Sequence, residues 1–93
     1  MAFPLKLPPP LGDAGWKVKI RENERVEPPH VTIFHQRSKQ WRLGLRDGKF
    51  LEPPGGSWKE IDVRVREVIE QNWTRLCEEW DQKYPSNPID SKD

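Results

Sequence analysis

Two histidines stand close together near the middle of the chain, in the stretch EPPHVTIFHQ at residues 27–36. Imidazole is the side chain best suited to proton transfer near neutral pH and it is a common metal ligand, so His30 and His35 are the candidate catalytic residues. Five positions separate them, and successive side chains of a strand alternate between its two faces. We therefore expect the two rings to point to opposite faces and not to share a metal ion.

The remaining metal-binding residue types are not grouped in a useful way. No cluster of Cys, His, Asp or Glu has the spacing of a zinc site, and the only cysteine, Cys77, has apolar neighbours in a predicted helix. A single cysteine also excludes an internal disulfide and suits a reducing compartment. We predict no metal and no cofactor, and we expect His30 to serve as a hydrogen-bonding residue where a strand begins.

A second set of residues has the chemistry to bind a polyanion. Cations gather on one face of a predicted sheet, or in the turn beside it, and Phe34 falls among them; the cations are Lys17, Lys19, Arg21, Arg37, Lys39, Arg42 and Arg46. Such a face could neutralise phosphates while the phenyl ring stacks on a base. The alternative is that these cations only keep an exposed sheet face in water and discourage edge pairing.

The strands that would position these residues are predicted by alternating apolar and polar side chains. WKVKIRE, residues 16–22, alternates strictly and is typical of a half-buried strand. Pro28 and Pro29 lack N–H donors and force extended geometry on the residues before them. A second strand should therefore begin near His30.

A third strand is predicted over residues 40–46, where every second residue is apolar. The dipeptide Asp47-Gly48 follows at once and favours a two-residue type I′ turn, because both of its residues tolerate a positive φ. The returning strand is then KFLE, residues 49–52.

From Ser57 onward the apolar period lengthens to that of a helix. Ser57 and Glu60 have the spacing of a capping box, and an apolar stripe follows over about seven turns until Pro85 ends it. The stripe consists of Ile61, Val65, Ile69, Trp73, Leu76 and Trp80. One long helix should therefore lie across the apolar face of the sheet, because neither element can bury its apolar side alone.

These elements predict an α+β fold, with an antiparallel β-meander of three to four strands packed on one long C-terminal α-helix. Residues 1–15 are rich in proline and lack periodicity, so we expect a disordered arm. Residues 16–84 should form a single domain, and residues 85–93 a disordered tail.

Composition and charge limit the class of protein further. The chain has 93 residues, of which 33% are hydrophobic and 33% charged, so a small core must rely on its five tryptophans. Residues 1–51 hold ten Lys and Arg against five Asp and Glu, whereas residues 52–93 hold six against ten. We expect a basic sheet face opposed to an acidic helix. Because the sequence shows no long apolar run and no leader, we expect a cytoplasmic protein without membrane contact.

Three segments resemble a widespread family of small bacterial domains of unknown function: EPPHVTI, QWRLGLRDGKFLEPPG and NWTRLCEEWD. Members typically show prolines and HVHV where a strand begins, a short hairpin, and a C-terminal helix with a leucine and a tryptophan near its end. The resemblance covers roughly residues 16–83. It extends, residue by residue, to Pro28, Pro29, His30, Asn72, Leu76 and Trp80, whereas Thr32 stands where the family usually has a second histidine.

Members of this family are often encoded beside another small protein and are suspected components of toxin–antitoxin modules. The resemblance therefore implies a small interaction module that pairs with a cognate small protein and could contact RNA or DNA through the basic sheet face. The alternative is a ribonuclease-type toxin in which His30 or His35 moves a proton during phosphodiester cleavage. Thr32 in place of the second histidine argues against a role that needs two imidazoles.

Overall fold

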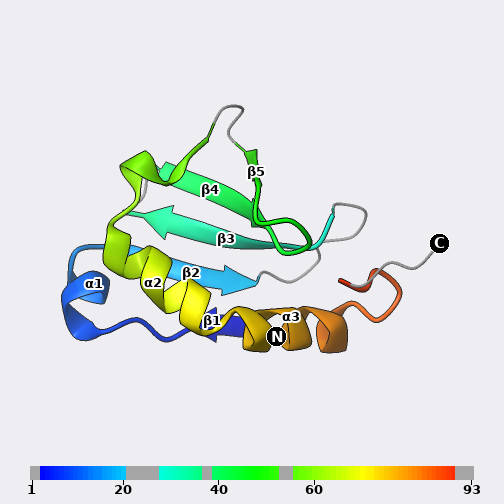
Figure 1. Cartoon of the computed structure of the whole chain (residues 1–93). Helices are drawn as coiled ribbons and strands as arrows, with labels where there is room; N and C mark the ends of the chain where they lie inside the picture. Colours follow the sequence, from blue (N-terminus) through cyan, green and yellow to red (C-terminus); the bar gives the residue numbers. More distant parts are fainter. Residues whose placement is uncertain (1–2, 21–27, 37–38, 53–55, 90–93) are drawn as a thin grey trace.

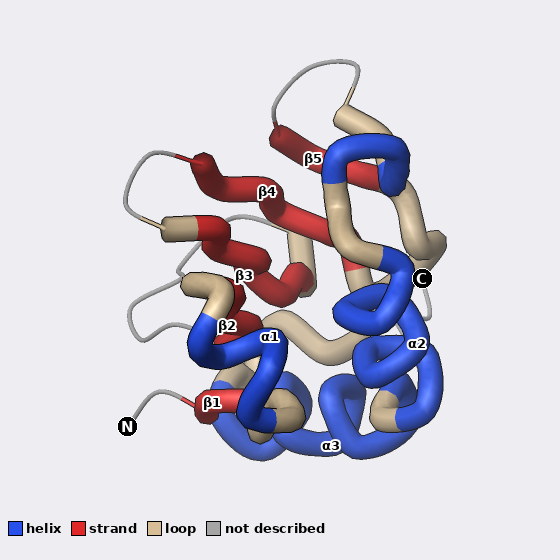
Figure 2. Tube along the Cα trace, turned by 90° about the vertical axis from the view of Figure 1, so that its left-hand side faces the viewer, coloured by secondary structure: helices blue, strands red, loops and turns tan. Residues whose placement is uncertain are grey.

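The sheet is antiparallel throughout, and its five strands follow one another across it in chain order (Figure 1). The strands are β1 (Phe3–Leu5), β2 (Trp16–Ile20), β3 (His30–His35), β4 (Lys39–Gly44) and β5 (Phe50–Glu52). The structure is a computed structural model and describes residues 3–20, 28–36, 39–52 and 56–89. Seen from the side, the helices α2 (Val63–Gln71) and α3 (Trp73–Lys83) lie on one side of the sheet (Figure 2). The α+β class is confirmed, although the sheet has more strands than we predicted.

Burial alternates along β2 as predicted, whereas the first four residues of β3, His30 to Ile33, are all buried. In β2, Trp16, Val18 and Ile20 are buried, while Lys17 between them is exposed. The second strand begins at His30, as the two prolines before it indicate. The buried side chains of these strands meet the helices, so the other face of the sheet is the one that carries the intervening polar residues.

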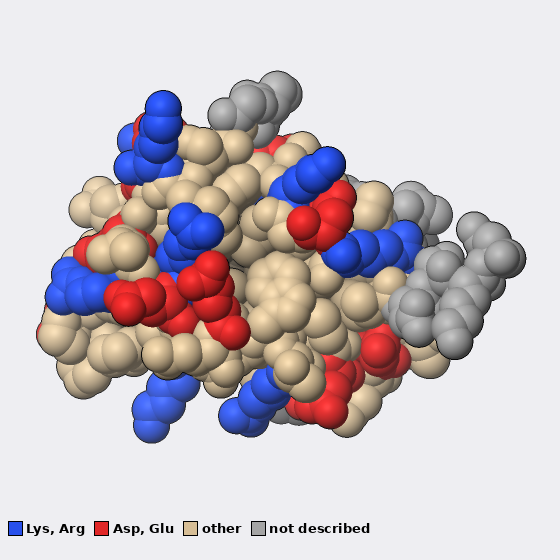
Figure 3. Space-filling model, in the orientation of Figure 1, with Lys and Arg blue, Asp and Glu red and all other residues tan. Residues whose placement is uncertain are grey.

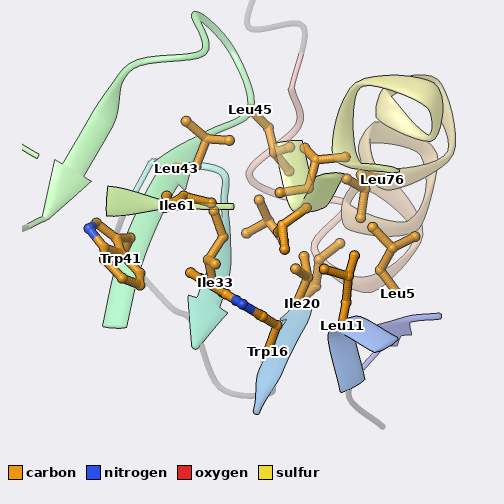
Figure 4. Packing of buried hydrophobic residues seen from close by; sticks show 14 of the residues in the cluster. Leu5, Leu11, Trp16, Ile20, Ile33, Trp41, Leu43, Leu45, Ile61 and Leu76 are labelled. Atoms are coloured by element: carbon orange, nitrogen blue, oxygen red, sulfur yellow. The ribbon is translucent and has the colours of Figure 1, made fainter. Parts of the chain in front are cut away.

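Residues 3–15, which we expected to be a disordered arm, instead form β1 and the short helix α1 (Pro9–Asp13). Leu5 and Leu11 are buried, and their side chains point toward Ile20 and Leu76 in the core (Figure 4). The prolines do not prevent this structure, because proline is well tolerated in the first turn of a helix and in an edge strand. The composition of this segment was therefore a poor guide to its structure.

The connection between β4 and β5 differs from the predicted two-residue turn. It runs over residues 45–49, and within it only Gly48 has a positive φ, 72°. The side chain of Asp47 accepts a hydrogen bond from the Lys49 backbone N–H at 3.0 Å, and Leu45 is buried. Because Leu45 belongs to the core and Asp47 forms a local side-chain turn, the chain needs a longer loop than a type I′ hairpin provides.

The helical region begins with the single 3₁₀ turn η1 (Trp58–Glu60) rather than with an α-helix. The Ser57 hydroxyl accepts from the backbone N–H of Lys59 at 3.3 Å, so it caps this turn and not a long helix. The cap of α2 is Asp62, whose carboxylate accepts from the backbone N–H of Arg64 at 2.9 Å. An aspartate at this position supplies the acceptor that the first turn needs.

The predicted single helix is broken at Asn72, which separates α2 from α3. The Asn72 side-chain amide donates to the carbonyl of Val68 at 2.8 Å, and the Asn72 backbone leaves helical geometry with φ −111° and ψ 16°. Asparagine favours such local bonds over a continuous helix. No helix among the described residues is long and apolar enough to span a membrane.

The residues of the predicted apolar stripe are buried on both sides of this break, with one exception. Ile61, Val65, Ile69, Leu76 and Trp80 are buried, whereas Trp73, directly after Asn72, is only partly buried.

Residues 85–89 pack against the rest of the fold, although we expected them to belong to a disordered tail. The Trp80 indole Nε1–H donates to the carbonyl of Asn87 at 2.7 Å, and Ile89 is partly buried against the core. The Arg46 guanidinium donates to the carbonyls of Pro88 at 2.7 Å and Ile89 at 3.0 Å. This segment is therefore attached to both α3 and the β4–β5 loop.

If α1 contributes to the core, removing its buried side chain will destabilise the whole protein. We expect Leu11→Ala to lower the free energy of unfolding by about 2–5 kcal/mol, the usual cost of truncating a fully buried leucine. The matched control is Leu51→Ala, at a leucine that is 37% exposed, which should cost less than about 1 kcal/mol. Urea unfolding measures both, and equal losses in the two variants would show that α1 is not part of the core.

Candidate nucleic-acid interface

His30 is almost completely enclosed, with 1% of its surface exposed. Its Nδ1–H donates to the carbonyl of Pro28 at 2.9 Å, and its ring lies 5.6 Å from the ring of Trp80. This is the structural, hydrogen-bonding role that the sequence suggests for it. A ring so enclosed has little access to a large substrate.

His35 lies at the other end of β3 and is half-buried. Its ring stacks on Trp16 with a centroid distance of 3.9 Å and an interplanar angle of 7°. Five residues of strand at about 3.3 Å each place the two histidines roughly 17 Å apart. That separation alone is enough to keep them from sharing a metal ion or one phosphodiester. Among the described residues, no three His, Cys, Asp or Glu side chains gather as a metal site would require.

Cys77 is the only other potential nucleophile that the sequence singles out. Burial raises the pKa of its thiol, and the nearby carboxylates of Asp81 and Glu78 raise it further. The thiol therefore stays protonated near neutral pH, and a protonated thiol is a weak nucleophile.

The face of the sheet turned away from α2 and α3 is called the outer face here. Because the buried apolar residues of β2, β3 and β4, such as Val18, Ile33 and Leu43, face the helices, the alternate residues of these strands face outward. Cross-strand pairing arranges them in two rows. In the first row Phe34 lies between Lys17 and Gln40; in the second, Thr32 lies between Lys19 and Arg42.

Phe34 lies on the middle strand of the sheet, one residue before the end of β3, and is half-buried. The ammonium nitrogen of Lys19 lies over its ring, 5.3 Å from the centroid, and Lys17 is its direct cross-strand partner. An aromatic face with two ammonium groups next to it can stack on a base while the cations neutralise phosphates.

The second row is less basic than the sequence suggests. The Arg42 guanidinium lies 3.6 Å from the carboxylate of Glu52, and only 19% of its side chain is exposed. Thr32 is fully buried between Lys19 and Arg42. Lys19 therefore supplies most of the accessible charge in this row.

Two further predicted cations are engaged elsewhere. Lys39 pairs with Glu60 at 3.5 Å, and Arg46 holds the C-terminal residues 87–89. Arg21 and Arg37 lie outside the described residues. Of the predicted site residues, the structure thus brings together Lys17, Lys19 and Phe34, with Arg42 at the edge of the group.

Gln40 belongs to the same face and was not among the predicted site residues. It is exposed and pairs with Phe34 across β3 and β4. The sequence alone did not indicate it, because its place beside Phe34 follows from the register in which His35 pairs with Lys39.

The helix-bearing side of the protein carries both signs of charge, interspersed over its surface (Figure 3). Several of these groups form ion pairs: Arg64 with Asp62 at 2.9 Å, and Arg66 with Glu70 at 3.2 Å. Hydrogen bonds from Arg64 lower the pKa of the Asp62 carboxyl. The predicted acidic helix is therefore a surface of mixed charges, some of which are paired.

The bonds made by Arg46 imply that this residue acts on stability and not on ligand affinity. We expect Arg46→Ala to lower the free energy of unfolding by about 1 kcal/mol, because carbonyls of the C-terminal segment lose a charged donor. The backbone N–H of Ile89 donates to the Asp81 carboxylate at 2.8 Å. In the variant, exchange of this amide hydrogen with solvent should become faster. Lys17→Ala is the control and should change neither quantity. Unchanged unfolding and unchanged exchange in Arg46→Ala would contradict this role.

Comparison with family models, with curated proteins and with solved structures finds no match to this chain.

Proposed function

We propose that the protein is a small binding module that holds a single-stranded nucleic acid on the outer face of its sheet. The observation that carries this proposal is the position of Phe34, half-buried beside its cross-strand partner Lys17 and under the ammonium of Lys19, on the face of the sheet turned away from α2 and α3.

Each group of this face has a distinct part in binding. The Phe34 ring offers a stacking surface for one base, worth about 1–3 kcal/mol in comparable sites. Lys17 and Lys19 supply the cations for the backbone on either side of that base. They stand two residues apart along β2, about 6.6 Å, a step comparable to one stretched nucleotide.

A single strand suits this arrangement better than a duplex. Bases in a duplex stack on each other and do not offer their faces to a side chain, whereas unpaired bases do. Lys19 already covers part of the Phe34 ring at 5.3 Å, so an incoming base displaces the ammonium from the ring. The ammonium can then turn to a phosphate, which keeps the cation paired.

The ribonuclease alternative gains less support from the geometry. His30 is buried against Trp80, His35 is stacked on Trp16, and the length of β3 separates them. The pairing with a cognate small protein stays a prediction from the family resemblance. Its test is whether the product of the neighbouring gene co-purifies with this protein.

Binding to labelled single-stranded RNA and DNA oligonucleotides of mixed sequence tests the proposal, with fluorescence anisotropy as the readout. We expect affinity to fall steeply between about 50 and about 200 mM salt, since phosphate contacts release counterions. Lys17→Gln and Lys19→Gln should each reduce the slope of log affinity against log salt by about 0.7. Phe34→Ala should weaken binding about 5- to 100-fold and leave the slope unchanged.

The matched control is Lys59→Gln, which removes an equally exposed lysine from η1, away from the outer face. This variant should bind like the original protein. Absence of binding at low salt would refute the proposal, and so would an equal loss in Lys59→Gln and Lys17→Gln.

A further inference from the structure

A hollow of about 360 Å³ opens on the helix-bearing side of the protein. None of the residues that line it belongs to the outer face. Four separate elements line it: the β4–β5 loop, η1, α2 and α3. The lining residues are Gly48, Trp58, Arg66, Glu70 and Trp73. We call it the aromatic hollow; its volume lies within the range of small-ligand sites.

The two indole rings of the hollow are held in place by the fold. Trp58 packs edge-on against Phe50 of β5, with ring centroids 5.1 Å apart and an interplanar angle of 72°. Trp73 directly follows the break at Asn72 and is the one residue of the apolar stripe that is not fully buried. A tryptophan at the start of α3 is therefore partly open to a ligand.

The hollow already contains the elements of a cation site. The guanidinium carbon of Arg66 lies 4.9 Å from the centroid of the Trp58 ring, within the range of a cation–π contact. The same guanidinium lies 3.2 Å from the carboxylate of Glu70. An indole face and a carboxylate thus converge on one positive group, which the chain itself supplies.

We propose that the aromatic hollow binds an organic cation, a quaternary ammonium or guanidinium group that replaces Arg66 between the Trp58 ring and the Glu70 carboxylate. Arg66 can give way at little cost, because 45% of its side chain is exposed and it can be hydrated outside the hollow. An anion is less suited to the hollow, because Glu70 stands next to Arg66, the only cation among the described residues that line it.

This inference is independent of nucleic-acid binding, since it shares no residue with the outer face. Aromatic surroundings recognise quaternary ammonium ions through the negative face of the ring, and a carboxylate beside the ring adds selectivity for charge. The ion could be a free small molecule or a side chain of a partner protein.

Nuclear magnetic resonance of the five indole N–H groups provides the test within one molecule. We expect choline or tetramethylammonium to shift the signals of Trp58 and Trp73, and to leave those of the buried Trp16, Trp41 and Trp80 in place. The control ligand is the uncharged isostere of choline, in which a tert-butyl group replaces the trimethylammonium group. It should cause much smaller shifts, and equal shifts would show that the hollow is only apolar and overturn the proposal.

Two variants at exposed positions should change the affinity for the cation in opposite directions. Arg66→Gln should tighten binding of the cation about two- to fivefold, because it removes the internal competitor. Glu70→Gln should weaken binding by a similar factor, because it removes the counter-charge. Weaker binding in Arg66→Gln would overturn the proposal, as would the absence of any shift at Trp58 and Trp73.

A short peptide with one trimethyllysine distinguishes the two sources of the cation. Tighter binding of the peptide than of tetramethylammonium identifies a protein side chain as the occupant. Equal affinity identifies the free ion. If neither ligand binds, the aromatic hollow is not a cation site.

Discussion

The fold depends on the burial of the apolar face of the sheet against the helices. In each central strand a large apolar side chain alternates with a polar one, so the three strands present a continuous apolar surface on one side. Trp80 and Leu76 of α3 and Ile69 of α2 cover that surface. The opposite side of the same strands carries Lys17, Lys19 and Phe34. The candidate interface is thus a direct consequence of how the core is made.

A chain of this size has few apolar residues for its core. Residues near both ends of the described chain therefore contribute side chains to it. Leu5 and Leu11 complete the apolar layer beside β2, while Ile89 packs beside Trp80. Arg46 fastens the C-terminal segment through backbone carbonyls. Arg46 therefore stabilises the fold through these bonds and does not contribute its charge to the outer face.

The central part of this architecture could be predicted from the sequence, because alternation is a local signal. The faces of β2 and the start of β3 at His30 follow from it directly. What could not be predicted depends on contacts between distant segments: the proline-rich start becomes β1 and α1 because the core has room for Leu5 and Leu11. The helix breaks at Asn72, where the side-chain amide donates to the carbonyl of Val68 in the preceding turn. The apolar stripe continues past this position, so the sequence pattern predicts one unbroken helix. The same limit applies to the site, since only the fold shows that Lys39 and Arg46 are already paired and that Gln40 stands beside Phe34.

Mapping of backbone amide signals tests most directly whether a nucleic acid binds to the outer face. A short single-stranded oligonucleotide is added to isotopically labelled protein at low salt, and the shifted amides are assigned. We expect the largest shifts at Lys17, Lys19, Phe34 and Gln40, with little change along α2 and α3. Shifts confined to the helix-bearing side, with the outer face unchanged, would contradict it.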